Sequence, residues 1–273
     1  MNLNKYLNYL KNKKLSPNTI TIYQTVISRY YHNSLTTENI TKFIKKLAKN
    51  KEPATCQLYL ASLISYSKYL KTYESINWDQ IKNFIPKKFR KFFTTIGEEE
   101  LELLKSARFE KNEIIYRRNN LILDFLFYSG IRVSELVNVK HRDWSDNSLR
   151  IHGKGNKVRH VLLPPFLVEY IRPGAKGYLF TNKNGKRIWT DKVREIISKR
   201  TKLAGIKKWV SPHTFRRSFA TLLNSRKCNL TTIQKLLGHS NLETTAQYIH
   251  NDYETLYEDY SKLWKSNINT YVN

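Results

Sequence analysis

Six side chains that can bind or react with a phosphate group stand in four short motifs of this chain. The motifs are YSGIRVSEL, HGKGNKVRHVLLP, SPHTFRRSFATLL and LLGHSNLETTAQYIH, and the residues are Arg132, Lys154, His213, Arg216, His239 and Tyr248. Guanidinium groups bind two phosphate oxygens at once, lysine and histidine transfer protons, and a tyrosine hydroxyl forms covalent esters. Together such groups can cut a phosphodiester and store its energy in a phosphotyrosyl bond, without ATP.

Two of the motifs also have ordinary interpretations when each is taken alone, and a third is more specific. Arg132 and Glu135 have the spacing of a surface ion pair, which contributes little to stability. Lys154 lies between two glycines, as in many basic hairpin turns. His213 and Arg216 share one face near a helix start opened by Ser-Pro, where free N–H groups favour a phosphate. The combination is therefore more informative than any single motif.

The sequence gives no sign of a metal or nucleotide cofactor. No compact Asp/Glu cluster that would bind Mg²⁺ accompanies the motifs, and neither GxxxxGK[ST] nor GxGxxG occurs. Cys56 and Cys228 are too few for a disulfide scaffold or a four-ligand zinc site. We therefore expect no metal and no cofactor, and a reducing, cytoplasmic location.

Charge points to a polyanionic partner. The 273 residues carry a formal net charge of +26, and 40% of them are apolar, which excludes wholesale disorder. Nucleic acid is the expected partner, because each neutralised phosphate releases counterions. A solubilising surface, or the Lys and Asn bias of an AT-rich genome, would also explain the charge. Neither a signal peptide nor a membrane span is expected.

Residues 1–86 are predicted to form a helical domain. Apolar spacing and Ser-Pro or Glu-Pro starts predict helices at 2–13, 17–32, 37–49 and 54–72. A basic segment, 87–97, is expected to be a linker, with a loop inside one domain as the alternative. Its Lys87, Lys88, Arg90 and Lys91 are predicted to contact DNA.

Residues 98–273 are predicted to form a mainly helical domain with a small sheet. Acidic residues after Gly97 predict a helix start, and a strong helix over 113–128 ends at Gly130. A short helix is expected over 132–139. Strands are predicted at 148–151, 157–163 and 178–181, and helices at 190–204, 213–226, 230–237, 242–249 and 253–265.

The four motifs resemble those of the tyrosine recombinases (phage integrase family), most of all the compact Xer-type members. They occur in family order, span most of residues 128–250, and place Tyr248 nine residues after His239. The resemblance implies two domains: an all-α N-terminal core-binding domain (SAM-like) and a mainly α catalytic domain with a small antiparallel sheet. Arg217 departs from the family, since many members carry His there, but the position lies outside the catalytic set.

The resemblance also implies a role for each residue of the site. Tyr248 resembles the nucleophile that forms a 3′-phosphotyrosyl bond and frees a 5′-hydroxyl. Arg132 and Arg216 resemble the pair that holds the non-bridging oxygens, a task for which lysine is a poor substitute. Glu135 resembles the acidic residue that supports the first arginine.

The resemblance assigns proton transfer to Lys154, His213 and His239. Lys154 resembles the general acid that protonates the leaving 5′-oxygen. His213 and His239 resemble the two histidines that hydrogen-bond the phosphate and assist proton transfer.

The C-terminal segment 253–273 differs from the rest of the chain. Residues 249–273 hold four acidic residues and two lysines, with an apolar helical stripe. The stripe consists of Tyr253, Leu256, Tyr257, Tyr260, Leu263 and Trp264. Packing inside the same chain is one interpretation; the family's habit favours docking on a neighbouring protomer of a tetramer.

The leading prediction is a site-specific recombinase that exchanges strands of double-stranded DNA through a Holliday junction, as a homo-tetramer and with a possible accessory protein. Two alternatives stay open: a DNA-binding module that does not cleave, and a type IB-like topoisomerase. Chromosome-dimer resolution and DNA inversion both fit, while the absence of an arm-binding domain argues against a lambda-type integrase.

Overall fold

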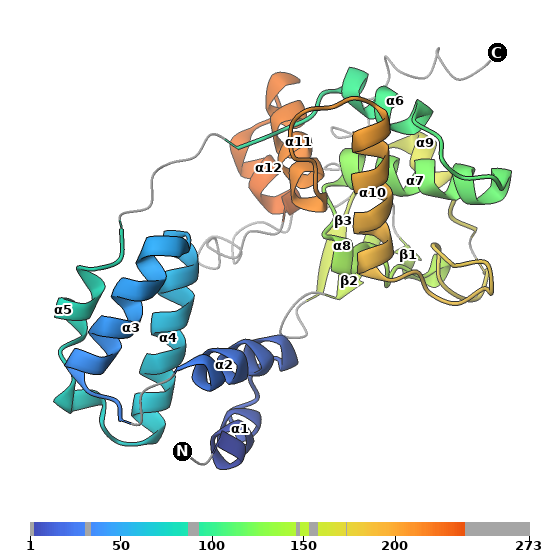
Figure 1. The fold of residues 1–273 in the computed structure, drawn as a ribbon. Helices are drawn as coiled ribbons and strands as arrows, with labels where there is room; N and C mark the ends of the chain where they lie inside the picture. Colours follow the sequence, from blue (N-terminus) through green and yellow to red (C-terminus); the bar gives the residue numbers. More distant parts are fainter. Residues whose placement is uncertain are drawn as a thin grey trace. The chain divides into compact units, whose positions relative to one another are not determined.

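The computed structural model describes residues 3–30, 34–86, 93–145, 148–152, 158–172 and 174–237. The chain divides into two units, Met1–Lys91 and Phe92–Asn273, each with its own apolar core (Figure 1). The division falls inside the segment expected to be a linker. Residues 93–97 belong to the second unit, where Ile96 is buried and its N–H donates to Ser218 Oγ over 2.8 Å.

The described part of the first unit consists of helices and no strands. The elements are α1 (Leu3–Asn12), α2 (Pro17–Arg29), α3 (Thr37–Asn50), α4 (Pro53–Tyr69), the 3-10 turn η1 (Tyr73–Ser75) and α5 (Trp78–Lys82). Prolines open α2 and α4 because the first turn needs no N–H from them. Ser16 and Thr36 cap α2 and α3 by accepting backbone N–H groups over 3.2 Å.

Four helices of the first unit were predicted within a few residues of their observed ends, and α5 was not. Apolar side chains from all five helices form one core, in which Tyr6 packs edge-on against Tyr66. Trp78 closes this core from α5, and its indole N–H donates to the Tyr73 carbonyl over 3.0 Å. Five residues are too few to show helical periodicity, which is why the sequence pattern missed α5.

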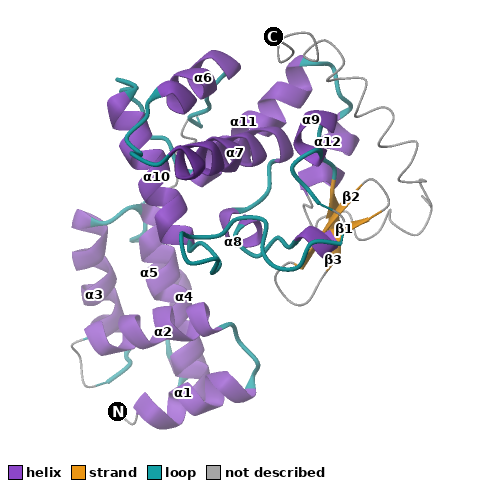
Figure 2. Cartoon of the chain, turned by 90° about the vertical axis from the view of Figure 1, so that its right-hand side faces the viewer, coloured by secondary structure: helices purple, strands orange, loops and turns teal. Residues whose placement is uncertain are grey.

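The second unit combines helices with a small sheet. Its helices are α6 (Glu98–Ser106), α7 (Glu113–Ser129), α8 (Val133–Leu136), α9 (Pro165–Val168), α10 (Thr190–Leu203), α11 (Pro212–Ser225) and α12 (Leu230–Leu237), with the 3-10 turn η2 (His141–Asp143). The buried helix α7 packs along α11. Figure 2 shows the three strands gathered beside the helices.

The sheet is antiparallel in the order β1 (Trp144–Ser145), β2 (Ser148–His152), β3 (Val158–Val161). The third strand was expected at 178–181, and that prediction was wrong. Tyr178 and Thr181 form only isolated bridges, with Lys140 and Arg187. The predicted helix over 132–139 is also shorter than expected, because only 133–136 are helical.

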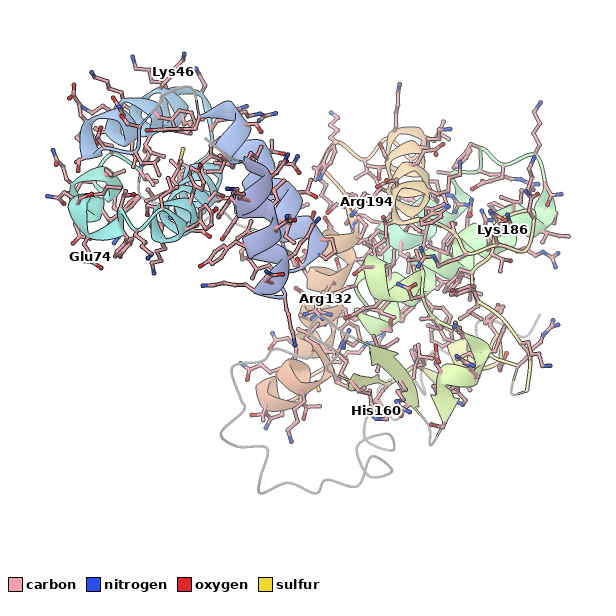
Figure 3. The ribbon with its side chains drawn as sticks, turned by 90° about the horizontal axis from the view of Figure 1, so that it is seen from below. Lys46, Glu74, Arg132, His160, Lys186 and Arg194 are labelled. Carbon is pink, nitrogen blue, oxygen red and sulfur yellow. The ribbon has the colours of Figure 1, made fainter. Side chains whose placement is uncertain are left out.

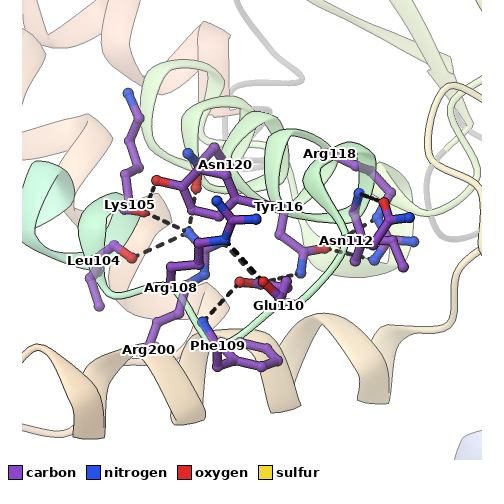
Figure 4. A network of polar contacts seen from close by, with 12 residues as sticks. Leu104, Lys105, Arg108, Phe109, Glu110, Asn112, Tyr116, Arg118, Asn120 and Arg200 are labelled. Atoms are coloured by element: carbon purple, nitrogen blue, oxygen red, sulfur yellow. Dashed lines mark hydrogen bonds and ion pairs between the residues drawn. The ribbon is translucent and has the colours of Figure 1, made fainter.

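A buried polar network around Arg200, which includes an ion pair, joins three helices of the second unit. Arg200 on α10 is fully buried, and its guanidinium donates to Glu110 Oε1 over 3.0 Å and to the Leu104 carbonyl over 3.2 Å at the end of α6. It also donates to Asn120 on α7 (Figure 4). A buried charge needs such partners to offset the loss of hydration, so this network fixes α6, α7 and α10 together.

Among the described residues, no helix is both long and apolar enough to cross a membrane. The same residues contain no cluster of three or more His, Cys, Asp or Glu side chains suited to a metal ion.

Candidate active site

The first site motif begins where α7 ends. Gly130 has a left-handed backbone with φ of +60°, which turns the chain out of the helix. An added Cβ would lie 2.4 Å from the Phe219 ring of α11, so the two elements are in close contact only because residue 130 is a glycine. Arg132 follows this turn, two residues after Gly130.

Arg132 and Glu135 are bonded twice. Arg132 stands at the N-cap of α8, where its N–H donates to Glu135 Oε2 over 3.0 Å. Its guanidinium donates to Glu135 Oε1 over 2.9 Å. The Arg132 side chain is 40% exposed and that of Glu135 is 5% exposed. The buried carboxylate therefore orients an arginine that still reaches solvent, unlike a pair held only at the surface. Figure 3 labels the Arg132 side chain in the second unit.

The third motif forms the first turns of α11. Ser211 caps the helix by accepting the Thr214 N–H over 3.4 Å, and Pro212 fills the first position. Arg216 is 9% exposed and donates to the Gly130 carbonyl over 2.6 Å and to the Leu237 carbonyl. His213, one turn earlier, is exposed. Arg216 thus ties the first motif to the last described residue of α12.

One residue of this cluster was missed from the sequence. Arg159 on β3 donates to Glu135 Oε2 over 2.6 Å and to the Leu236 carbonyl over 3.0 Å. It lies in the second motif, but the partners are 24 and 77 residues away and no local spacing indicates them. Strand alternation was the available signal: the residue two positions on, Val161, is buried.

Positive charge is concentrated at this place. Burial and the charges of Arg132 and Arg159 lower the pKa of Arg216 to about 10, with Glu135 acting in the opposite direction. Arg216 stays protonated at neutral pH. The cluster therefore holds three guanidinium groups and one carboxylate, and the excess positive charge favours an anion.

Glu135 remains ionised in this setting. Burial raises the pKa of its carboxyl group, but hydrogen bonds and charge from Arg159 and Arg132 outweigh burial and lower the pKa below its ordinary value. The carboxylate can therefore keep accepting all three hydrogen bonds at neutral pH.

His213 is held mostly neutral. Partial burial, followed by the positive charges of Arg217, Arg216, Arg132 and Arg194, lowers the pKa of its imidazole. A neutral imidazole can accept a proton or donate one, as general acid–base chemistry requires.

The structure brings Arg132, Glu135, His213 and Arg216 together in the second unit. The other predicted site residues lie outside the described residues: Lys154, His239 and Tyr248 of the site, and Lys87, Lys88, Arg90 and Lys91 of the basic segment. The predicted helices at 242–249 and 253–265 lie outside them too. What the described residues can do is bind and orient an oxyanion with two arginines.

Comparisons with known proteins identify the family. The profile of the phage integrase family matches residues 94–255. A tyrosine recombinase of Thermosipho africanus (strain TCF52B) is 33% identical over 262 residues, covering 87% of this chain and 90% of that protein. Tyrosine recombinase XerC of Anoxybacillus flavithermus (strain DSM 21510 / WK1) is 30% identical over 277 residues, covering 91% and 92%. The chain therefore belongs to the phage integrase family, and its relatives there are tyrosine recombinases.

Solved structures confirm the predicted fold class. A lambda integrase fragment (75–356), a dimer bound to a COC′ core site, matches with a TM-score of 0.72 at 16% identity, covering 88% of this chain and 94% of that chain. XerH bound to palindromic difH, in a post-cleavage complex, matches with a TM-score of 0.64 at 22% identity, covering 90% and 78%. The predicted enzyme class, a tyrosine site-specific recombinase, is likewise confirmed by the family and its relatives.

Proposed function

We propose that this protein cuts and rejoins double-stranded DNA at specific sites through a phosphotyrosyl intermediate at Tyr248 and a Holliday junction. The observation that carries the proposal is the pairing of Arg132 with Arg216. The Gly130 turn and the start of α11 bring the two guanidinium groups into one cluster with excess positive charge. This is the arrangement that binds and activates a phosphodiester.

The proposed cleavage reaction needs neither a metal nor a nucleotide. The Tyr248 oxygen forms a bond to the scissile phosphorus, and the bond from phosphorus to the 5′-oxygen breaks. The Tyr248 hydroxyl passes its proton to His213 or His239, which assist proton transfer at the phosphate, and Lys154 supplies the proton that the 5′-oxygen takes up. Arg132 and Arg216 hold the non-bridging oxygens while charge develops on them. Attack by a 5′-hydroxyl of the partner strand reverses these steps and rejoins the DNA.

Both units contribute to DNA binding in this proposal. Residues 1–88 carry a net charge of +11 and the remainder +15, so positive charge is spread over the chain. Helices α2 and α4 are the candidates for groove contact. Uncharged side chains are exposed on both, among them Gln24 and Ser28 on α2 and Gln57 on α4. Amide and hydroxyl groups of this kind read base edges, whereas the basic segment 87–97 would contact phosphates.

The working assembly is proposed to be a homo-tetramer on DNA. A lambda integrase tetramer bound to a Holliday junction is among the structures this chain resembles, with a TM-score of 0.71 at 15% identity. Docking of segment 253–273 on a neighbouring protomer would link the four copies, and an accessory protein would activate them. The protein would act in the cytoplasm, on the nucleoid, in chromosome-dimer resolution or DNA inversion.

Trapping of covalent adducts tests the proposal. Purified protein is mixed with nicked genomic fragments of the organism that encodes it, in EDTA and without ATP. A nick near the cleavage point lets the cut end diffuse away, so that the adduct accumulates. The attached DNA ends are then sequenced. We expect adducts at defined sites, and none from a Tyr248→Phe variant that still binds DNA.

The other outcomes separate the alternatives. Adducts scattered without sequence preference would instead indicate a topoisomerase. Tight binding without adducts, with and without cell extract as a source of activator, would indicate a DNA-binding module. Adducts at one locus favour resolution, and adducts at several inverted repeats favour inversion.

A further inference from the structure

Arg159 connects three of the four sequence motifs through one side chain. Each of its two terminal nitrogens makes a different hydrogen bond. One donates to Glu135 Oε2 over 2.6 Å, and the other donates to the Leu236 carbonyl over 3.0 Å. Glu135 in turn holds Arg132 by two hydrogen bonds. A side chain of the second motif thereby reaches the first motif and the helix that leads into the fourth.

The strand register explains why Arg159 points inward. Arg159 pairs with Ile151 on β2, and the neighbouring pair on the same face is Leu149 with Val161. All three apolar partners are buried, and the side chain of Arg159 is 15% exposed. Arg150 and His160 form the pair on the opposite face. Burying a guanidinium among apolar side chains is unfavourable unless its hydrogen bonds compensate, so the two contacts account for its position.

The planar guanidinium is what makes this double contact achievable. Its nitrogens lie in a fixed fork and donate in two directions at once, whereas a lysine offers one ammonium group. Arg216 makes the matching contact one residue later, at the Leu237 carbonyl. Two guanidinium groups therefore hold successive carbonyls at the end of the described part of α12.

We propose that Arg159 is a positioning residue of the recombination site: it fixes the Glu135 carboxylate, and through it Arg132, relative to the β2–β3 hairpin and the end of α12. This inference rests on the proposed function, because the role of Arg132 is to bind the scissile phosphate. Arg159 itself does not contact DNA. Its loss disorients Arg132 and releases α12 from β3, while the phosphate-binding groups stay in the chain.

The first test compares Arg159→Met with Arg150→Met. Both remove one guanidinium from the same sheet, but Arg150 is exposed on the other face. The substrate is a nicked duplex carrying a site recovered by adduct trapping. We expect the single-turnover rate of adduct formation to fall about 10- to 100-fold in Arg159→Met, as for small misplacements of reacting groups. DNA affinity should stay close to that of Arg150→Met, and matching far-UV circular dichroism should show that both variants are folded.

The second test asks whether Arg159 acts through Glu135. Glu135→Gln and the double variant Arg159→Met/Glu135→Gln complete a mutant cycle. Once Glu135 has lost its charge, removing Arg159 should slow adduct formation by about threefold or less, well below the single-variant effect. A merely structural role of Arg159 predicts instead that the two losses multiply, and that result would overturn the proposal.

A third measurement needs no DNA. Rotation about the Cζ–Nε bond of Arg132, followed by NMR in the free protein, should speed up in Arg159→Met and not in Arg150→Met. An unchanged rotation would contradict the proposal even if wild-type protein formed no adducts. Absence of wild-type adducts would count against the proposed function alone, so the two failures are distinguishable.

Discussion

At the scale of single residues, both partial burial and the surrounding positive charges lower the pKa of His213. Partial burial contributes first, and Arg217 is the first of the positive charges that lower the pKa of the imidazole. Arg217 is exposed and its guanidinium lies 4.3 Å from the centre of the Phe93 ring. It can therefore be changed without opening the core.

We expect Arg217→Gln to raise the pKa of His213 towards its ordinary value, because one positive charge is removed while partial burial and the other arginines remain. NMR titration of the imidazole in the free protein measures the change. Arg142→Gln, on the exposed side of η2, is the matched control and should leave the titration unmoved. An unchanged titration in Arg217→Gln would show that the charge of Arg217 does not lower the pKa of His213.

The same shift has a small effect on stability with a defined sign. Because the folded pKa lies below the ordinary 6.5, the unfolded chain binds a proton first as the pH falls. Stability therefore rises with pH between the folded and the ordinary pKa, and this contribution favours unfolding at lower pH. His213 is exposed, so solvent screens most of it.

Residue types and short spacings indicated two pairs, Arg132 with Glu135 and His213 with Arg216, and the motifs taken together, with the family resemblance, implied that the two pairs belong to one site. Each pair lies within one turn of chain, and helix starts are signalled locally by Ser-Pro or Gly. The contribution of Arg159 could not be predicted in this way. Its partners meet it only through the packing of β3 against α8 and α12, which no local pattern encodes.

At the scale of elements, the close contact of Gly130 with Phe219 makes the end of α7 sensitive to any side chain. We expect Gly130→Ala to lower stability by about 2–4 kcal/mol, since a left-handed alanine is strained and its Cβ overlaps the ring. Urea denaturation measures the loss. The Arg216 contact to the Gly130 carbonyl should weaken with it, so adduct formation should also slow.

Gly205→Ala provides the control for this prediction. Gly205 also has a positive φ, of +68°, but an added Cβ there meets nothing within 4 Å. It should lose about 1 kcal/mol from backbone strain alone. Equal losses in the two variants would show that the Phe219 contact relaxes at no cost.

The buried network around Arg200 gives a second prediction at this scale. Glu110→Gln keeps the shape of the side chain but leaves the guanidinium of fully buried Arg200 without its counter-charge. We expect a loss of about 3 kcal/mol, as when one partner of a buried pair is removed.

Glu195→Gln is the matched substitution, on the exposed side of α10, where the carboxylate pairs with Lys192 and Lys199. It should cost below about 1 kcal/mol. Comparable losses in Glu110→Gln and Glu195→Gln, measured by urea denaturation, would contradict the role of the buried pair.

Elements with strong periodicity or clear ends were predicted well, and short ones were not. Helices α7 and α10 have apolar faces and end signals that the sequence shows directly. The strand expected at 178–181 had the right residue types, but a strand also needs a partner, and the third strand instead forms at Trp144–Ser145. Pairing is a property of the tertiary fold, so composition alone misplaces it.

At the scale of the whole molecule, the acidic, apolar segment 253–273 is expected to serve assembly and not DNA binding. Removing it should leave affinity for a single duplex site unchanged and reduce the formation of paired-site complexes. Electrophoretic mobility on one-site and two-site DNA, with sedimentation to count protomers, measures both. Unchanged synapsis in the truncated protein would show that the segment packs within its own chain.

The contacts of Arg216 bear on how inactive variants are interpreted. Because its guanidinium donates to the main chain at Gly130 and Leu237, any substitution of Arg216 removes these structural contacts together with the proposed contact to phosphate. The loss of activity in an Arg216 variant would therefore combine a structural effect with a catalytic one. Such a variant is a poor model of an inactive but correctly folded protein. Tyr248→Phe deletes a single oxygen, and it is the variant on which complexes with uncut DNA should be built.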